Sequence, residues 1–331
     1  MILAGDIGGT NTRLALFEVG RDGLRATVEA TLPSRQQPSL QATARAFLAS
    51  HKTPVQHACF GVAGPVVRGR SEATNLPWVV DAREAATALS LGEVWLINDL
   101  EATAYGIAAL PPADFVVLNP GAPAATGNAA VIAAGTGLGE AGLYWDGVRH
   151  RPFACEGGHA TFAPTDETQV QLLQYLLKRY AHISWERVLS GPGLYTIYQF
   201  LRDTGAGEEP GWLREGLREG DPAAVISRAA LEGRSPVCAR ALDLFVALYG
   251  AEAGNLALKV MATGGVFLAG GIAPKILPKL QAPTFREAFV AKGRMQSLLE
   301  AIPIRVIVND KTALIGAARY AALRAGVLAD A

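Results

Sequence analysis

The sequence predicts an α/β protein made of two related halves. Its opening residues, 1–19, contain an apolar strand, a glycine-rich turn and a second strand over residues 13–19. Residues 129–148 repeat this layout around a second glycine turn, and segments with helical periodicity follow both hairpins. Strand-rich openings followed by helices are typical of the α/β class. The length of 331 residues predicts about two domains.

The composition excludes several classes of protein. Half of the residues are hydrophobic and 18% are charged, which is enough for large buried sheets and excludes disorder. The net charge is zero and no charge block stands out, so we expect neither nucleic acid nor a membrane as a partner. No apolar run approaches the ~20 residues that span a bilayer. The three cysteines, Cys59, Cys155 and Cys238, are far apart and fit a reducing, cytoplasmic location.

In the first half, residues 55–61 and 94–98 are predicted as short buried strands, because each is apolar and is closed by polar or glycine residues. Residues 82–91 and 99–110 have helical periodicity, and Pro111-Pro112 ends the second helix. A connector rich in proline, glycine and alanine follows. We therefore expect a domain boundary near residues 110–128.

The second half is predicted to be more helical. Residues 167–180, 192–202 and 236–263 carry apolar side chains at helical spacing, whereas the polar residues 205–220 are expected to form a surface excursion. A buried strand over 266–269 leads through Gly270-Gly271 into a helix from Pro274. The chain ends with a strand over 304–308 and an apolar helix over 312–328.

The first glycine turn is a candidate phosphate site. It consists of Gly5, Asp6, Ile7, Gly8, Gly9 and Thr10. Glycines let backbone N–H groups crowd around an anion, and the Asp6 carboxylate suits a hydrated Mg²⁺ carried by the phosphates. The turn lacks the ending of a Walker A loop, and no helix follows it as in a dinucleotide fingerprint. Taken alone, it is equally well an ordinary tight turn.

The second glycine turn, Gly135-Thr136-Gly137-Leu138-Gly139, offers backbone donors and the Thr136 hydroxyl to a phosphate. As a lone pattern it favours an ordinary turn. Paired with the first turn, it favours a site that holds the β- and γ-phosphates of a nucleotide from both sides. Further along the chain, paired glycines on both sides of the strand at 266–269, including Gly270 and Gly271, permit close approach to a flat ligand such as adenine.

Asn98-Asp99 ends a buried strand and begins a helix, which is the usual place for a site in an α/β protein. Two interpretations remain open. Asn and Asp are preferred helix N-caps, so the pair is explained by capping. Alternatively, Asp99 is the general base for a substrate hydroxyl and Asn98 hydrogen-bonds the same ligand.

Glu156-Gly157-Gly158-His159 places a carboxylate and an imidazole on a glycine turn, which suits sugar hydroxyls because they need both donors and acceptors. A surface turn is the alternative, and no second His or Cys lies at the spacing of a zinc site. Glu186 by itself is explained as a solvated glutamate. Asn75, in Thr74-Asn75-Leu76-Pro77-Trp78, lies on a polar loop that reaches a substrate or serves only to pack Trp78.

Together these motifs resemble bacterial ATP-dependent glucokinases, of the hexokinase–actin–chaperone ATPase superfamily. The resemblance spans nearly the whole chain and is more specific than any single motif. The segments that carry it, in the family's order, are residues 5–11, 74–78, 98–99, 135–139, 156–159, 186–194 and 264–274.

The resemblance implies two actin/hexokinase-like (ribonuclease H-like) α/β domains around a central cleft. The small domain is residues 1–110 with 309–331 returning to it, and the large domain is residues 111–308. The implied reaction is phosphorylation of D-glucose at O6 by ATP with Mg²⁺. A homodimer is the family-based expectation.

By the same resemblance Asp99 matches the catalytic base, and Asn98, Glu156, His159 and Glu186 match residues that bind glucose hydroxyls. Gly5–Thr10 and Gly135–Gly137 match the two phosphate segments, and 264–271 falls in the adenosine segment. The cysteine cluster of the related zinc-binding repressor/kinase group is missing after His159, so the chain resembles the zinc-free branch. Glu140 departs from the apolar residue of relatives, and strand alternation predicts that it faces outward.

Three other functions are consistent with parts of this pattern. A kinase for mannose, fructose or an N-acetylated sugar is the nearest. A sugar-responsive regulator of the related group would carry a DNA-binding helix-turn-helix ahead of the phosphate loop, where only four residues stand. A structural ATPase of the actin type would not need the acid and histidine set around a sugar.

Overall fold

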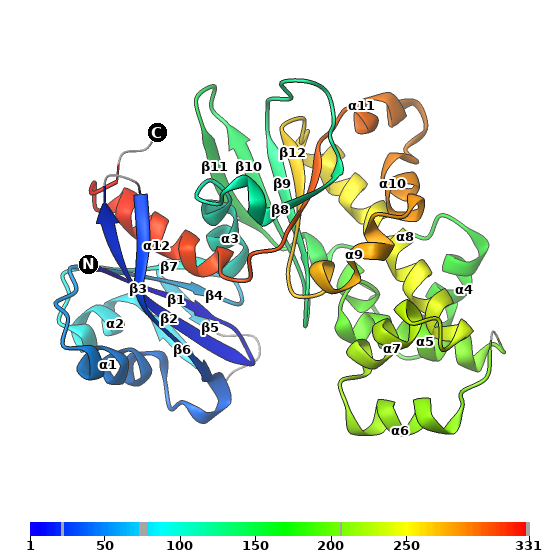
Figure 1. Cartoon of the computed structure of the whole chain (residues 1–331), viewed down its shortest axis with the longest axis horizontal. Helices are drawn as coiled ribbons and strands as arrows, with labels where there is room; N and C mark the ends of the chain where they lie inside the picture. Colours follow the sequence, from blue (N-terminus) through cyan, green and yellow to red (C-terminus); the bar gives the residue numbers. More distant parts are fainter. Residues whose placement is uncertain (21–22, 73–77, 206, 329–331) are drawn as a thin grey trace. The chain divides into compact units, whose positions relative to one another are not determined.

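The computed structural model describes residues 1–20, 23–72, 78–205 and 207–328, and it divides into two compact units (Figure 1). The first unit comprises Met1–Asp114, Pro152–Ala154 and Asn309–Ala331. The second unit comprises Phe115–Arg151 and Cys155–Val308. Each unit has a β-sheet covered by helices, so both are of the α/β type.

The first unit is built on a five-stranded sheet in the order β3-β2-β1-β4-β7. The strands β1, β2 and β3 form an antiparallel meander, and β1, β4 and β7 run parallel. A short separate hairpin pairs β5 with β6. The strands of this unit are β1 (Ile2–Ile7), β2 (Asn11–Gly20), β3 (Gly23–Pro33), β4 (His57–Val62), β5 (Arg70–Glu72), β6 (Val79–Asp81) and β7 (Val94–Asn98).

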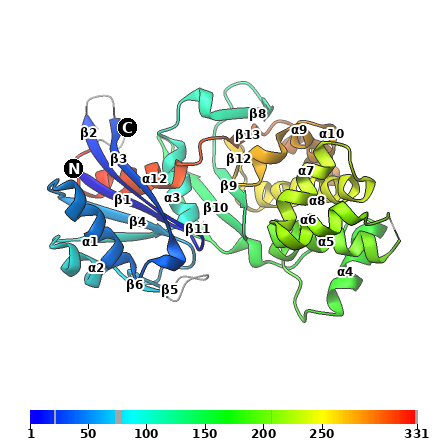
Figure 2. The same ribbon diagram turned by 60° about the horizontal axis from the view of Figure 1, so that its bottom comes forward.

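Helices cover both faces of this sheet (Figure 2), which makes three layers. On one face, apolar side chains of α1 and α2 pack on strand residues such as Leu3 and Phe60. On the other face, α3 and α12 pack on Ile2 and Ala4. The helical segments are η1 (Ser34–Gln36), α1 (Leu40–His51), α2 (Ala82–Leu89), α3 (Asp99–Ile107), η2 (Pro112–Asp114) and α12 (Thr312–Arg324). Because β1 is buried on both sides, its sequence is almost continuously apolar.

Two glycines let α3 and α12 approach closely. A Cβ at Gly106 would collide with the carbonyl oxygen of Thr312, and a Cβ at Gly316 would collide with that of Ala102. The C-terminal helix is therefore fitted against the helix that begins at Asp99.

The second unit is built on a six-stranded sheet in the order β11-β10-β9-β12-β13-β8. The hairpin of β9 and β10 is antiparallel, β9, β12 and β13 run parallel, and β8 is antiparallel to β13. Its strands are β8 (Phe115–Asn119), β9 (Ala129–Ala134), β10 (Leu138–Trp145), β11 (His150–Cys155), β12 (Gly265–Ala269) and β13 (Ile304–Ile307).

Helices account for most of the remainder of this unit. They are η3 (Gly157–His159), α4 (Glu167–Leu177), η4 (Trp185–Arg187), α5 (Gly191–Asp203), α6 (Gly211–Glu219), α7 (Pro222–Leu231), α8 (Pro236–Val260), η5 (Ala273–Ile276), α9 (Leu277–Leu280), α10 (Pro283–Val290), η6 (Gly293–Met295) and α11 (Gln296–Glu300). The long helix α8 packs its apolar residues, among them Phe245 and Tyr249, in the same core as Ile132 and Val266 of the sheet.

Helix α8 also meets the length and hydropathy expected of a membrane span, which corrects the expectation that no apolar run comes near that length. It is the one such helix in the described part of the chain, and 72% of its most apolar window is buried inside the protein. Its apolar character is explained by this central position in the core.

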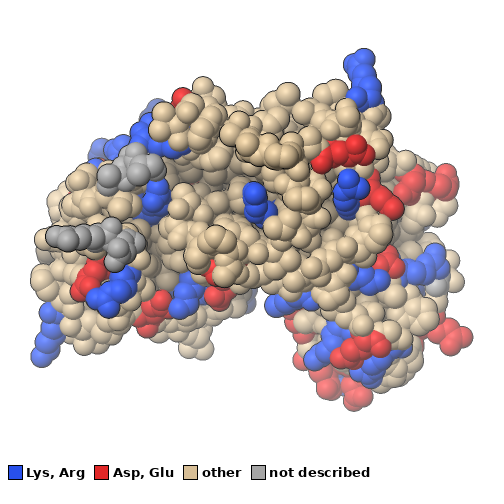
Figure 3. Space-filling view, turned by 45° about the horizontal axis from the view of Figure 1, so that its top comes forward, with Lys and Arg blue, Asp and Glu red and all other residues tan. Residues whose placement is uncertain are grey.

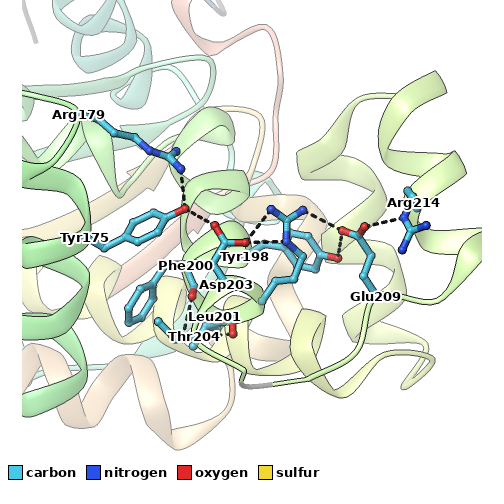
Figure 4. A network of polar contacts seen from close by, with 10 residues as sticks. Tyr175, Arg179, Tyr198, Phe200, Leu201, Asp203, Thr204, Glu209 and Arg214 are labelled. Atoms are coloured by element: carbon cyan, nitrogen blue, oxygen red, sulfur yellow. Dashed lines mark hydrogen bonds and ion pairs between the residues drawn. The ribbon is translucent and has the colours of Figure 1, made fainter.

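A polar network joins the helices α4, α5 and α6 (Figure 4). The Tyr175 hydroxyl donates to Asp203 Oδ2 at 2.7 Å. The adjacent Arg202 donates to Asp203 Oδ1 at 2.9 Å and to Glu209 Oε2 at 3.1 Å. Glu209 also accepts from the Tyr198 hydroxyl at 2.8 Å. These contacts lie away from the glycine turns in sequence and tie the helices of the second unit to one another.

The charged side chains are mixed in sign. On the face drawn in Figure 3, Lys and Arg side chains are interspersed with Asp and Glu side chains. This face therefore carries no extended patch of a single sign, as the balance of 30 basic and 30 acidic residues allows.

The sequence analysis predicted several elements well and missed others. The strand at Val94–Asn98 has the predicted bounds, and α8 and α12 lie within their predicted ranges. The described residues of 205–220 lie at the surface as predicted, with Leu213 the one buried residue among them, but the prediction missed the helix α6 at Gly211–Glu219. Its glycine and charged residues weaken the apolar pattern by which a helix is predicted. The strand β3 and the helices α1 and α7 were missed.

Candidate active site

The first glycine turn joins β1 to β2 and is fastened from outside the hairpin. The Gly8 N–H donates to the Asn11 carbonyl oxygen at 3.0 Å. Ser34, in the turn after β3, donates its hydroxyl to the Gly8 carbonyl at 2.7 Å and its N–H to the Thr10 carbonyl at 2.9 Å. Its Oγ lies 2.9 Å from Thr12 Oγ1. The turn that we predicted as a phosphate site is thus held in one shape.

Ser34 is a functional candidate that the sequence analysis missed. Its side chain is fully buried behind the turn. A lone serine after a strand carries no motif, and its contact with Gly8 spans 26 residues of sequence. Only the pairing of β2 with β3 brings it there.

Asp6 lies on β1 opposite Arg13 of β2 and next to Gly61 of β4. Burial raises the pKa of Asp6 to about 6, the Arg13 guanidinium lowers it, and the Asp310 carboxylate raises it. Arg13 is itself engaged by Asp310, through Asp310 Oδ2 at 2.8 Å and through the Asp310 carbonyl. A desolvated carboxylate whose neighbouring cation is already engaged fits a further cation, so the residues present suit the predicted Mg²⁺.

At the end of β7, the structure separates the roles of Asn98 and Asp99. The Asn98 side chain accepts the N–H groups of Leu100 at 2.8 Å and Glu101 at 3.3 Å, and it donates to the Gly64 carbonyl at 3.1 Å. Asn98 is therefore the N-cap of α3. Asp99 is the first residue of the helix and is partly buried, with its Oδ1 3.0 Å from the Leu100 nitrogen.

The second glycine turn joins β9 to β10 and contacts Glu186. The Gly135 N–H donates to the Gly137 carbonyl at 2.8 Å, and the Gly191 N–H donates to the Gly135 carbonyl at 2.8 Å. Glu186 Oε2 accepts the Leu138 N–H at 3.0 Å. A Cβ at Gly137 would collide with the same carboxylate oxygen, so a larger residue there would displace the Glu186 carboxylate. Glu186 is thus bound to the turn rather than freely solvated.

The segment Glu156–His159 lies beside the Glu186 segment. The Trp185 N–H donates to the Ala160 carbonyl at 3.0 Å, and the His182 ring nitrogen lies 3.0 Å from the His159 carbonyl. A Cβ at Gly158 would collide with the carbonyl of Leu138. Both Glu156 and His159 have exposed side chains. The structure therefore brings together three sequence-predicted segments, at 135–137, 156–159 and 186.

Gly270 and Gly271 adjoin the same turn. Gly270 has a φ of +81°, and a Cβ there would lie 2.5 Å from the Ala134 carbonyl oxygen. The Ile272 N–H donates to that carbonyl at 3.2 Å. The predicted adenosine segment thus lies against the start of the second glycine turn. Asn75, also predicted as a site residue, lies outside the described residues.

The expectation that Glu140 faces outward is wrong. Its side chain is only 1% exposed. Strand alternation places Glu140 on the same face of β10 as Leu138, and that face packs in the core of the second unit. Glu140 points into the protein beneath Gly157, where a Cβ would collide with Glu140 Oε2.

Comparison with known proteins identifies the family. A family model described as "Glucokinase" matches residues 3–324. The chain is 44% identical to a glucokinase of Nostoc punctiforme over 97% of this chain and 99% of the relative. It is 38% identical to a glucokinase of Stenotrophomonas maltophilia over 97% of this chain and 95% of the relative.

Solved structures agree. A glucokinase from an Antarctic psychrotroph superposes with a TM-score of 0.81 at 34% identity, covering 97% of this chain and 98% of that one. A glucokinase of Streptomyces griseus, solved with glucose and AMPPNP, superposes with a TM-score of 0.66 at 21% identity, covering 97% and 99%, and supports the fold. The fold is the actin/hexokinase-like α/β fold that the sequence resemblance implied. The chain belongs to the glucokinase family and is an enzyme of the phosphotransferase class.

Proposed function

We propose that the chain transfers the terminal phosphoryl group of ATP to O6 of D-glucose. One observation carries the proposal. The second unit gathers an acid and histidine pair, a second carboxylate and a glycine turn within a chain whose residues 3–324 match the glucokinase family model. The two carboxylates and the histidine suit the hydroxyl groups of a sugar, and the glycine turn suits a phosphate.

In this proposal, Glu156, His159 and Glu186 bind sugar hydroxyls. Glu156 and His159 are exposed and stand three residues apart at the two ends of one turn, so both can point at the same ligand. Glu186 accepts one backbone N–H through Oε2, and a carboxylate has further acceptor positions for a hydroxyl. Recognition by hydrogen bonds discriminates strongly between sugars, because a wrong sugar leaves buried polar groups unpaired.

The general base is proposed to be Asp99. The Asn98 oxygen caps α3 and shares the Leu100 N–H with Asp99 Oδ1, and the Asp99 carboxylate has further acceptor positions for a substrate proton. Asp99 accepts the proton of the O6 hydroxyl as that oxygen attacks, a contribution typically worth ~10²–10⁴-fold. Asn98 retains an amide N–H beyond its contact with Gly64, and we propose that this donor, with Asn75, meets the same sugar.

The two glycine turns are proposed to bind the nucleotide. The Gly8 and Gly135 N–H groups are bound within their turns, so the other backbone N–H groups of the two turns and the hydroxyls of Thr10 and Thr136 are proposed to meet phosphate oxygens, and Gly270-Gly271 to admit the adenine. Asp6 would hold Mg²⁺ through water, and the ion when bound neutralises charge on the phosphates. Phosphoryl transfer depends mainly on positioning and charge stabilisation, which these backbone donors supply.

The assignment of domains is part of the proposal. We propose that residues 1–110 with 309–331 form the small domain and that 111–308 form the large one. The two compact units, with divisions at Asp114 and Asn309, support it. A homodimer, a cytoplasmic location and a lack of nucleic-acid or membrane partners are proposed on family and composition alone.

The test is a coupled assay of ADP release with a panel of hexoses and phosphoryl donors. We expect D-glucose with MgATP to give the highest kcat/KM. A higher kcat/KM with mannose, fructose or an N-acetylated sugar would replace glucose as the substrate. ATP turnover that no hexose stimulates would overturn the proposal.

A further inference from the structure

A buried carboxyl group with no hydrogen bond lies beneath the proposed sugar segment. Glu140 is 1% exposed, and neither of its carboxyl oxygens has a hydrogen-bond partner within the described structure. Such a group is costly, because its lost contacts with water are not replaced. None of the steps proposed above uses it.

The Glu140 carboxyl lies directly against Gly157. A Cβ at Gly157 would collide with Glu140 Oε2, so the backbone between Glu156 and Gly158 rests on this side chain. Gly158 rests in the same way on the Leu138 carbonyl of the same strand. These contacts with β10 therefore set the position of the turn at Glu156–His159 relative to the sheet.

Other titratable groups surround Glu140. From α8, the fully buried Glu252 accepts from Lys259 Nζ at 3.0 Å and from Asn255 Nδ2 at 2.8 Å, and the Tyr249 hydroxyl is buried nearby. Burial raises the pKa of the Cys155 thiol of β11, Glu140 raises it further and Lys259 lowers it. Lys292 donates to Asn255 Oδ1 at 2.8 Å and completes the group. The charge of Glu252 is thus balanced by Lys259, whereas the Glu140 carboxyl is opposed by the Glu252 carboxylate.

We propose that Glu140 is a positioning residue for the sugar: its carboxyl group supports Gly157 from below and thereby sets the positions of Glu156 and His159. This inference rests on the proposed function, since only there do Glu156 and His159 bind sugar. In this proposal, the affinity for sugar depends on whether the Glu140 carboxyl is protonated.

The charge of Glu140 decides whether this support is stable. Burial raises the pKa of Glu140 to about 8, the Glu252 carboxylate raises it further, and Lys259 opposes both. At pH 7 the carboxyl is neutral and packs against Gly157. Above pH about 8 it ionises beside Glu252, and the repelled carboxylate must move or take up water. Gly157 then loses its support, and glucose affinity falls while ATP affinity is retained.

The test compares the wild type with Glu140→Gln and Glu140→Ala between pH 6.5 and 9.5. Glucose Kd is measured by calorimetry, and KM for glucose and for ATP by the coupled assay. We expect the wild-type glucose Kd to rise by about tenfold across this range, which corresponds to the loss of roughly one hydrogen bond. Glu140→Gln has the same shape and cannot ionise, so its glucose Kd stays flat. Glu140→Ala removes the support and raises the glucose Kd at every pH, with KM for ATP unchanged.

Two controls separate the outcomes. Ile132→Val trims the cross-strand neighbour of Glu140 without touching Gly157, and should lower Tm while leaving the glucose Kd and its pH dependence as in the wild type. Glu156→Gln tests the sugar site itself. If it leaves glucose Kd unchanged, the proposed sugar site fails.

If Glu156→Gln weakens glucose but Glu140→Gln keeps the wild-type pH dependence, only the present inference is overturned. Equal effects of Glu140→Ala on glucose and ATP would also overturn it. Should Glu140→Ala fail to fold, the pH profile of Glu140→Gln still decides.

Discussion

Two neighbouring residues at the end of β7, Asn98 and Asp99, have different roles. Asn98 uses its side-chain oxygen to cap α3 and its amide to hold Gly64. Asp99 follows it as the first residue of the helix. From the sequence alone, either helix capping or catalysis could explain this pair of residues. The structure gives the cap to Asn98, and the chemistry proposed for Asp99 is thereby compatible with a well-formed helix.

Asp99→Asn is expected to keep glucose binding and to lower kcat by ~10²–10⁴-fold, because the amide cannot accept the O6 proton. Calorimetry measures binding, and the coupled assay measures kcat. Glu101→Gln is the matched control on the same helical turn and should retain most of the activity. A variant at position 99 with most of its kcat would rule out the general base.

The pH dependence of nucleotide use is expected to report Asp6. The pKa of Asp6 is raised to about 6, so the carboxylate is ionised at pH 7 and takes up a proton as the pH falls through 6. Its attraction for a cation is then lost. We expect kcat/KM for MgATP, which reports the free enzyme, to fall about tenfold per pH unit below 6. A flat profile from pH 5 to 7 would separate Asp6 from nucleotide binding.

At the scale of elements, both glycine turns are held by residues outside their own hairpins. Ser34 fastens the first turn, and Glu186 and Gly191 fasten the second. The turns are therefore preorganised, and a ligand does not have to order them on binding.

Ser34→Ala is expected to destabilise the protein by about 1 kcal/mol, because it leaves the half-buried Gly8 carbonyl without its hydroxyl donor. KM for ATP should rise while KM for glucose stays near the wild-type value. Denaturant unfolding and the coupled assay measure the two effects. Ser50→Ala, which removes a hydroxyl from the exposed face of α1, should change neither.

Gly316→Ala is expected to force α12 away from α3, since its Cβ would meet the Ala102 carbonyl. Overpacking of this kind costs about 1–3 kcal/mol. Gly92→Ala is the matched control, because open space surrounds that position. Equal unfolding free energies for the two variants would show that the helices have room to separate.

Elements with strong apolar patterns were predictable. Features that depend on residues distant in the sequence were not. The strand at Val94–Asn98 and the helix α8 are buried along most of their length, so their patterns are clear. In β3 no residue is fully buried, and the pattern that would mark a strand is weak. Similarly, the pKa of Glu140 depends on its burial and on Glu252 and Lys259, which lie more than a hundred residues away in sequence. The motif residues were proposed from the chemistry that each side chain offers, and their roles remain predictions for the assays described here.

For the molecule as a whole, pH acts on stability through its buried carboxyls. Glu140 has a folded-state pKa raised from 4.5 to about 8. The folded state therefore keeps a proton that the unfolded state releases above pH 4.5, and folding stability falls as the pH rises from there to 8. Asp6 acts in the same direction between 3.8 and about 6.

Glu140→Gln is expected to remove the larger part of this slope. Its Tm should exceed that of the wild type by an amount that grows between pH 5 and 8, as measured by calorimetry at fixed ionic strength. A constant difference in Tm over this interval would mean that Glu140 does not titrate there.

The return of the chain to its first unit has a consequence for biosynthesis. Helix α12 covers the face of the first sheet that carries Ile2, Ala4 and Ala15. Until residues 312–324 have been synthesised, α3 is the one described helix available to cover that face. The second unit is contiguous apart from Pro152–Ala154 and precedes α12 in the sequence, so it can fold first during synthesis. The core of the first unit closes only after α12 has emerged.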